Sequence, residues 1–206
     1  MIDAAETRPE ADKDRDRIVN FSDGVFAIAI TILILDINVP EGLSAEEVSA
    51  RVLALWPEYL GYVISFLVLA IYWQAHHRVF RSIRRYDSTL VWLNFLFLMA
   101  ICFLPFPTSL LGKYGGEQVS VVVYAADAAV ASLLLGAVSW YATSEHRLVT
   151  PDLDDEEERI RRLQGLAVPV VFLASIAISF LSPMAAMYSW LLLAVTDPVI
   201  RRLWSR

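Results

Sequence analysis

The sequence has a single cysteine, Cys102, and this residue lies inside an apolar run. One cysteine excludes an internal disulfide, so we expect its side chain to behave as a small buried hydrophobic group. The sequence also lacks a glycine-rich phosphate loop, a nucleophile elbow and a His-Glu-x-x-His zinc motif. These absences argue against an enzyme, and against a bound cofactor or a resident metal.

Polar sequence is also scarce. Hydrophobic residues make up 57% of the 206 residues, which is more than a soluble domain of this size usually contains. Several apolar runs are long enough to cross a hydrocarbon layer of about 30 Å. We therefore expect an all-α, polytopic membrane protein with six transmembrane helices in one domain. The predicted spans are 18–38, 57–75, 89–110, 119–142, 163–181 and 184–203.

Basic residues are nearly absent from one side of this topology. Six spans place 15 of the 17 Lys and Arg residues in the two terminal segments and in the loops 76–88 and 143–162. Only Arg51 and Lys113 fall on the opposite side. The positive-inside rule then places both termini in the cytoplasm. The basic segment 78–85 is expected to face anionic lipid in the bilayer, and no nucleic-acid partner is expected.

The connections carry recognisable local signals. Residues 43–54 have helical spacing, and Ser44 with Glu47 forms a capping box, which predicts a short amphipathic helix at the membrane surface. Trp73, at the end of the second span, is expected to be an interfacial anchor. Pro105 would kink or end the third span. No cleavable signal peptide is visible, so the first span is expected to direct insertion.

The first span begins with polar residues and then continues without a charge from Gly24 to Leu35. Residues three, four and seven positions apart share one face of a helix. An aliphatic stripe with a single hydroxyl results, formed by Ile28, Thr31, Ile32 and Leu35. From chemistry alone this stripe fits helix packing, with Thr31 bonded to its own backbone.

A motif at the start of this span suggests a second interpretation. The pattern Arg17-x-x-x-Phe21-Ser22-Asp23, directly before a first transmembrane helix, resembles the signature of the transmembrane protein 175 family. Members of that family are potassium-permeable channels of bacteria and of animal endosomes and lysosomes. Residue by residue the resemblance covers only the first span, whereas chain length and span number agree over nearly the whole chain.

The resemblance implies a potassium-selective or potassium-preferring cation channel. It implies a homo-oligomer, a tetramer, with the pore on the oligomer axis and lined by the first helix of each subunit. A compact form with one copy of the motif resembles the bacterial members, which implies the bacterial inner membrane as its location. The family pattern makes Ile28 the narrowest position, with Ile32 and Leu35 in the hydrophobic constriction and Thr31 as the selectivity candidate.

The polar residues at the start of the first span, where the resemblance places the pore entrance, have structural explanations as well. Arg17 and Asp23 are six residues apart, which places them 120° away from a shared face, so each needs a partner on another helix or subunit. Asp23 can also offset the positive helix N-terminus and ease cation entry. His76 and His77 follow the second span, where a cationic side chain suits a helix C-terminus. Either could instead be a network partner of Ser22 or Asp23.

One further residue supports a different class of function. Asp127 is an acid in the fourth predicted span, and an acid inside a membrane is a functional candidate by default. Together with Asp23 it could serve a secondary transporter or a proton pathway. That function would require a broken helix near the membrane centre, whereas the first span is continuous and aliphatic. A non-conducting membrane scaffold is the third alternative.

Overall fold

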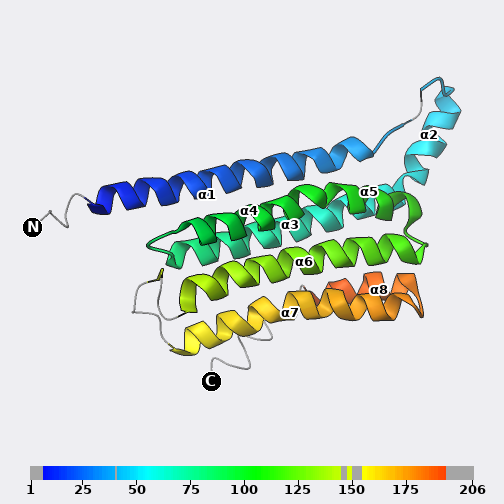
Figure 1. The fold of residues 1–206 in the computed structure, drawn as a ribbon. Helices are drawn as coiled ribbons and strands as arrows, with labels where there is room; N and C mark the ends of the chain where they lie inside the picture. Colours follow the sequence, from blue (N-terminus) through cyan, green and yellow to red (C-terminus); the bar gives the residue numbers. More distant parts are fainter. Residues whose placement is uncertain (1–6, 40, 145–147, 150–154, 194–206) are drawn as a thin grey trace, which may run out of the picture.

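A computed structural model describes residues 7–39, 41–144, 148–149 and 155–193. Within these residues the secondary structure is helical, apart from one isolated bridge between Ile83 and Val149. Long helices run side by side along one axis, from α1 on one edge to α7 and α8 on the other (Figure 1). In chain order the elements are α1 (Thr7–Ile32), η1 (Leu33–Asp36), α2 (Ala45–Ala54), α3 (Trp56–Ser82), α4 (Ser88–Phe103), α5 (Pro105–Tyr114), α6 (Gln118–Thr143), α7 (Asp155–Ser179), α8 (Pro183–Ser189) and η3 (Trp190–Leu192).

Four helical segments of the described chain are long and apolar enough to cross a membrane. These candidate spans are Asp16–Asp36, Trp56–Ser82, Ser88–Tyr114 and Gln118–Thr143. They correspond in position to the first four predicted spans. The fifth prediction coincides with a shorter apolar segment, Gly165–Ser179, and the sixth extends beyond the described residues. The chain is therefore a multi-pass helical membrane protein, and a total of six spans stays a prediction.

Two segments predicted as loops are partly helical. α3 continues to Ser82, because His76 and Phe80, one turn apart, are both buried against neighbouring helices and hold its last turns in place. α7 begins at Asp155, inside the predicted loop 143–162. In the sequence, acidic residues there precede arginines by four positions, a spacing that favours helix formation.

Local signals in the connections agree with the structure. The hydroxyl of Ser44 accepts a hydrogen bond from the Glu47 backbone N–H, and the Glu47 carboxylate accepts one from the Ser44 N–H, which confirms the capping box. The third predicted span breaks at Leu104, directly before Pro105. The prediction for Cys102 is wrong: the side chain is exposed on the outer face of α4, where it meets lipid or another chain rather than the core.

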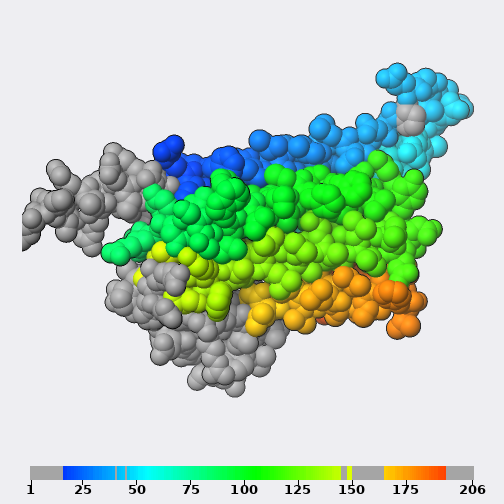
Figure 2. Space-filling model, in the orientation of Figure 1, coloured from blue at the N-terminus to red at the C-terminus, as the bar shows by residue number. Residues whose placement is uncertain are grey.

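The core lies between the helices on the inner side of α1. Phe26, Leu69, Phe97 and Tyr124, from α1, α3, α4 and α6, are almost completely buried in one apolar cluster. α1 packs on α3 and α4, whereas α6 packs on α4, α5 and α7. α1 therefore lies at the edge of the bundle, and its outward side is not covered by any described part of the same chain (Figure 2).

Candidate pore helix and its polar support

The two sides of α1 differ sharply in exposure. Ile28 is 61% exposed and Leu35 is 69% exposed, and Thr31 and Ile32 are exposed between them. On the opposite side Phe26 and Leu33 are buried in the core. The stripe singled out in the sequence thus coincides with the uncovered side of α1, where it can contact lipid, another copy of the chain or a water-filled passage.

Thr31 is the hydroxyl in this exposed stripe. Its Oγ1 donates a hydrogen bond to the backbone oxygen of Ile28 over 2.9 Å, as the packing interpretation expects. This hydrogen bond uses the single hydrogen of the Thr31 hydroxyl. The lone pairs of its oxygen remain available as acceptors. The same geometry that satisfies the helix backbone therefore leaves an oxygen able to contact a cation.

Ser22, in the motif, starts a buried hydrogen-bond chain. Its hydroxyl is completely buried, donates to the backbone oxygen of Ile18 over 2.9 Å and accepts from Asn94 Nδ2 over 3.1 Å. The Asn94 amide oxygen lies 3.0 Å from Nε2 of His76. α1, α4 and α3 are thereby joined through three side chains.

The same chain determines the tautomer of His76. Since Asn94 uses its NH₂ group towards Ser22, its oxygen must accept, and Nε2 of His76 must carry the hydrogen. The ring stacks on Phe80 with centroids 4.3 Å apart and lies nearly parallel to Phe97 at 5.7 Å. Nδ1 is buried and has no hydrogen-bond partner within the described structure. His76 thus acts as a neutral, aromatic and polar connector rather than a cationic helix terminus.

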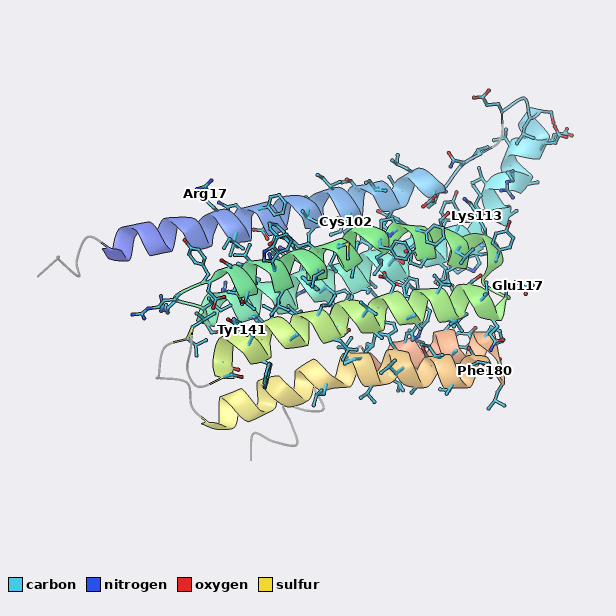
Figure 3. The ribbon with its side chains drawn as sticks, viewed as in Figure 1. Arg17, Cys102, Lys113, Glu117, Tyr141 and Phe180 are labelled. Carbon is cyan, nitrogen blue, oxygen red and sulfur yellow. The ribbon has the colours of Figure 1, made fainter. Side chains whose placement is uncertain are left out.

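Asp23 turns to a different partner on the same neighbouring helix. Its Oδ1 accepts a hydrogen bond from the indole N–H of Trp73 over 2.8 Å. The Trp73 ring in turn stacks on His77 with centroids 5.7 Å apart. Arg17 is exposed, six residues before Asp23, and lies at the opposite end of the bundle from Lys113 (Figure 3). Asp23 therefore anchors the start of the transmembrane part of α1 to α3.

Comparison with known proteins identifies the family of this chain. A family model described as endosomal/lysosomal potassium channel TMEM175 matches residues 17–105, which begin at the motif arginine. A potassium channel of Streptomyces collinus is 37% identical over 170 residues, covering 81% of this chain and 82% of that protein. The chain belongs to the TMEM175 family.

Further relatives agree with this assignment. A potassium channel of Chamaesiphon minutus is 35% identical over 187 residues, covering 88% of this chain and 90% of that protein. The crystal structure of a lysosomal potassium-selective channel TMEM175 homolog from the same organism matches with a TM-score of 0.78 and 33% identity. That match covers 91% of this chain and 97% of the solved one. The family resemblance seen in the motif is thus confirmed.

Sequence reasoning missed two residues of this TMEM175-family entrance. Asn94 is absent from the sequence-based candidates, although a lone amide within an apolar span is a signal of a buried polar contact. Trp73, predicted as an interfacial anchor, also donates a hydrogen bond to Asp23, which the sequence did not indicate. Neither pairing could follow from the sequence, because the partners lie 50 and 72 positions apart in the chain.

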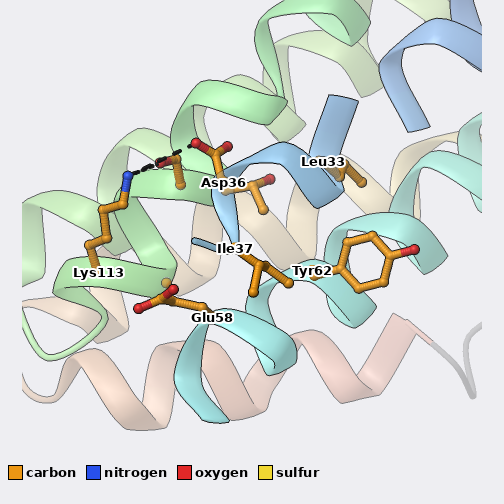
Figure 4. Close-up of a pocket in the computed structure, with 9 residues that line it drawn as sticks. Leu33, Asp36, Ile37, Glu58, Tyr62 and Lys113 are labelled. Atoms are coloured by element: carbon orange, nitrogen blue, oxygen red, sulfur yellow. Dashed lines mark hydrogen bonds and ion pairs between the residues drawn. The ribbon is translucent and has the colours of Figure 1, made fainter. Parts of the chain in front are cut away.

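At the other end of the bundle, acids surround the exit of the candidate pore helix. Asp36 directly follows Leu35, and its Oδ1 lies 3.9 Å from Nζ of Lys113 on α5. Glu58 lies 3.7 Å from Arg51 of α2. Asp36, Glu58 and Lys113 line a small hollow with room for roughly one water molecule (Figure 4). The two basic residues at this end are thus both held by acids.

Asp127 lies apart from this helix. It is buried in α6, and one carboxylate oxygen has no hydrogen-bond partner within the described structure. α6 packs on α3, α4, α5, α7 and α8, whereas Asp23 lies on α1, which packs on α3 and α4. The two acids proposed for a proton pathway are therefore on helices that are not packed together as neighbours.

Proposed function

We propose that this cation channel prefers potassium and conducts along the exposed side of α1. The observation that carries the proposal is that Ile28, Thr31, Ile32 and Leu35 all lie on the uncovered side of a helix whose other side is firmly packed. Bacterial relatives named as potassium channels support potassium as the ion. Aliphatic rings of this kind can close a pore by excluding water.

One copy of α1 cannot enclose a passage, so the channel must contain several subunits. We propose a homotetramer with the four α1 helices around the axis, as the family resemblance implies. In that assembly Ile28 forms the narrowest ring, and Ile32 and Leu35 continue the constriction. The Thr31 oxygens form a polar ring between the aliphatic ones, where partly dehydrated potassium can be preferred.

The motif residues support this helix rather than contact the ion. Ser22 is buried and hydrogen-bonded, and Asp23 is bonded to Trp73, so both fix the position of α1 relative to α3 and α4. Phe21 is exposed beside them. The strong bias of basic residues to the end that carries Arg17 supports a cytoplasmic location for both termini, and we propose the bacterial inner membrane as the site of the protein.

Potassium flux into liposomes tests the pore assignment. Ile28→Asn should conduct more than the parent, because a polar side chain keeps water in the constriction. Ile34→Asn is the matched control, since Ile34 is also exposed but lies off the stripe, and we expect it to conduct like the parent. Equal flux in all three proteins, each shown to be folded and oligomeric, would refute the assignment of Ile28.

The role of Thr31 has its own test. Thr31→Val keeps the shape of the side chain and removes the oxygen, so the permeability ratio of potassium over sodium should fall towards one. Reversal potentials under bi-ionic conditions measure this ratio directly. An unchanged ratio in Thr31→Val would leave the hydroxyl with its backbone role only.

A further inference from the structure

Four arginines at the end of α3 lack acidic partners in the described structure. Arg78, Arg81, Arg84 and Arg85 are all exposed, and no carboxylate of the described residues lies within salt-bridge distance of them. An arginine stays charged at any physiological pH. Within the described residues these four side chains form a cluster of positive charge that an anion can neutralise.

The last two of these arginines are held on an ordered segment. The backbone N–H groups of Arg84 and Arg85 donate to the oxygen of Leu148, over 2.8 and 3.3 Å, and the adjacent Ile83 is paired with Val149. Ile83 and Leu148 are buried in a second apolar cluster beneath this segment. The two guanidinium groups thus extend from a fixed backbone, which lowers the entropic cost of binding.

A hollow begins immediately after these arginines. It has a volume of about 430 Å³, within the range of small-molecule sites, and its lining includes Tyr86, Asp87, Trp92 and Phe95. Asp87 is the one acid in this lining, and its carboxylate is held in place because Oδ1 accepts from the Leu90 N–H and Oδ2 accepts from the Tyr141 hydroxyl. The segment lies at one end of the bundle beside the start of α1 (Figure 2).

Exposed aromatic rings continue from the hollow along α4. Trp92 is 67% exposed and packs edge to face on Phe95, which packs edge to face on Phe21 of α1. Phe95 is seven residues, about 10 Å, further along the helix than Ser88. The arginine charges at the membrane surface are therefore followed, at the depth of the upper acyl chain, by a row of exposed aromatic rings, which we call the aromatic wall (Trp92 and Phe95 of α4).

We propose that this surface is a binding site for an anionic phospholipid. Arg84 and Arg85 hold the phosphate group, the hollow takes the rest of the headgroup, and one acyl chain lies on Trp92 and Phe95 of α4. The order of charge, hollow and aromatic wall matches the order of groups in a lipid. A second subunit covering the same wall is the competing arrangement, and it would not need the arginines.

Quenching by brominated lipids tests the proposal without any measurement of ion flux. The full-length protein is placed in phosphatidylcholine vesicles containing either brominated phosphatidylglycerol or brominated phosphatidylcholine, and tryptophan fluorescence is recorded. The Trp92 contribution is the difference between the parent and Trp92→Phe. We expect it to be quenched preferentially by phosphatidylglycerol. The preference should fall about five-fold for each arginine removed in Arg84→Gln and Arg85→Gln, and Arg51→Gln, at the other end, should leave it unchanged.

Any of three other outcomes would overturn the proposal. A Trp92 contribution that neither lipid quenches means that another subunit covers the wall. Equal quenching by both lipids, or a preference that survives the arginine substitutions, means that no headgroup site exists. Release of brominated phosphatidylglycerol by millimolar glycerol 3-phosphate would show a site for a free phosphate instead of a lipid.

Discussion

Asn94 offers the sharpest test of how the entrance is held together. It is the middle member of the buried chain from Ser22 to His76 and makes one hydrogen bond to each. Asn94→Leu removes both bonds and keeps a similar side-chain volume, so little of its effect comes from a cavity. Interhelical side-chain hydrogen bonds in membranes average about 0.6 kcal/mol and reach about 1.7 kcal/mol. Two lost bonds and an unpaired His76 N–H should together reduce the free energy of unfolding by about 1–3 kcal/mol.

The assay is chemical unfolding in mild detergent, followed by circular dichroism. Asn38→Leu is the matched control, because Asn38 is exposed and its side chain bonds to the nearby Leu35 oxygen of the same segment. Ser22→Ala removes one of the two bonds and should have a smaller effect. The double variant should be less destabilised than the sum of the two, by about 0.6 kcal/mol, since both remove the same bond.

Two results would refute this reasoning. If Asn94→Leu is no less stable than Asn38→Leu, the buried chain does not stabilise the fold. If the effects of Ser22→Ala and Asn94→Leu are fully additive, the two side chains do not interact, and the hydrogen bond between them is not formed in solution.

Three other predictions have equally definite outcomes. Trp73→Phe keeps a ring and removes the donor to Asp23, so we expect a loss of about 1 kcal/mol in the same unfolding assay, and an unchanged stability would show that this bond contributes nothing. Gly112→Ala should destabilise the folded protein, because the added carbon would lie 3.2 Å from the Glu58 Cα of α3. Gly136→Ala is the control: its added carbon meets nothing within 4 Å, so this variant should be as stable as the parent or more stable. Equal effects of the two variants would contradict the close approach of α3 and α5 at Gly112. Asp127→Asn should leave potassium flux intact, whereas loss of flux would favour the transporter alternative.

The sequence could predict the first four spans because each one is a long apolar run bounded by Pro, Gly or charge. It could not predict where α3 ends, since the basic residues from 76 to 85 are typical of a loop. Burial of His76 and Phe80 by other helices decides that end, and such contacts are tertiary. The exposure of Cys102 has the same origin: an apolar run in a membrane protein is compatible with the core and with lipid contact alike.

The candidate site likewise has one part that helical spacing predicts and another part that only the packing of the helices determines. The stripe from Ile28 to Leu35 follows from helical spacing alone, and the structure places it on the uncovered side of α1. The partners of Ser22 and Asp23 do not follow from spacing, because Asn94 and Trp73 are brought to them only by the packing of α4 and α3. Periodicity identifies a face of a helix, but it does not identify the residue that the face will meet.

The contrast between the two sides of α1 has a consequence for how the channel is built. Hydrogen bonds through Ser22 and Asp23 fix α1 to α4 and α3, and Phe26, Ala29 and Leu33 pack into the same inner side. A helix held so firmly on one side cannot turn to bury the other side within its own subunit. The aliphatic stripe must then be covered by lipid or by copies of itself around an axis. In the proposed pore, large movements would have to move α1 together with α3 and α4, so gating at a constriction formed by Ile28 is expected to proceed by small side-chain changes and dewetting rather than by rotation of α1 alone.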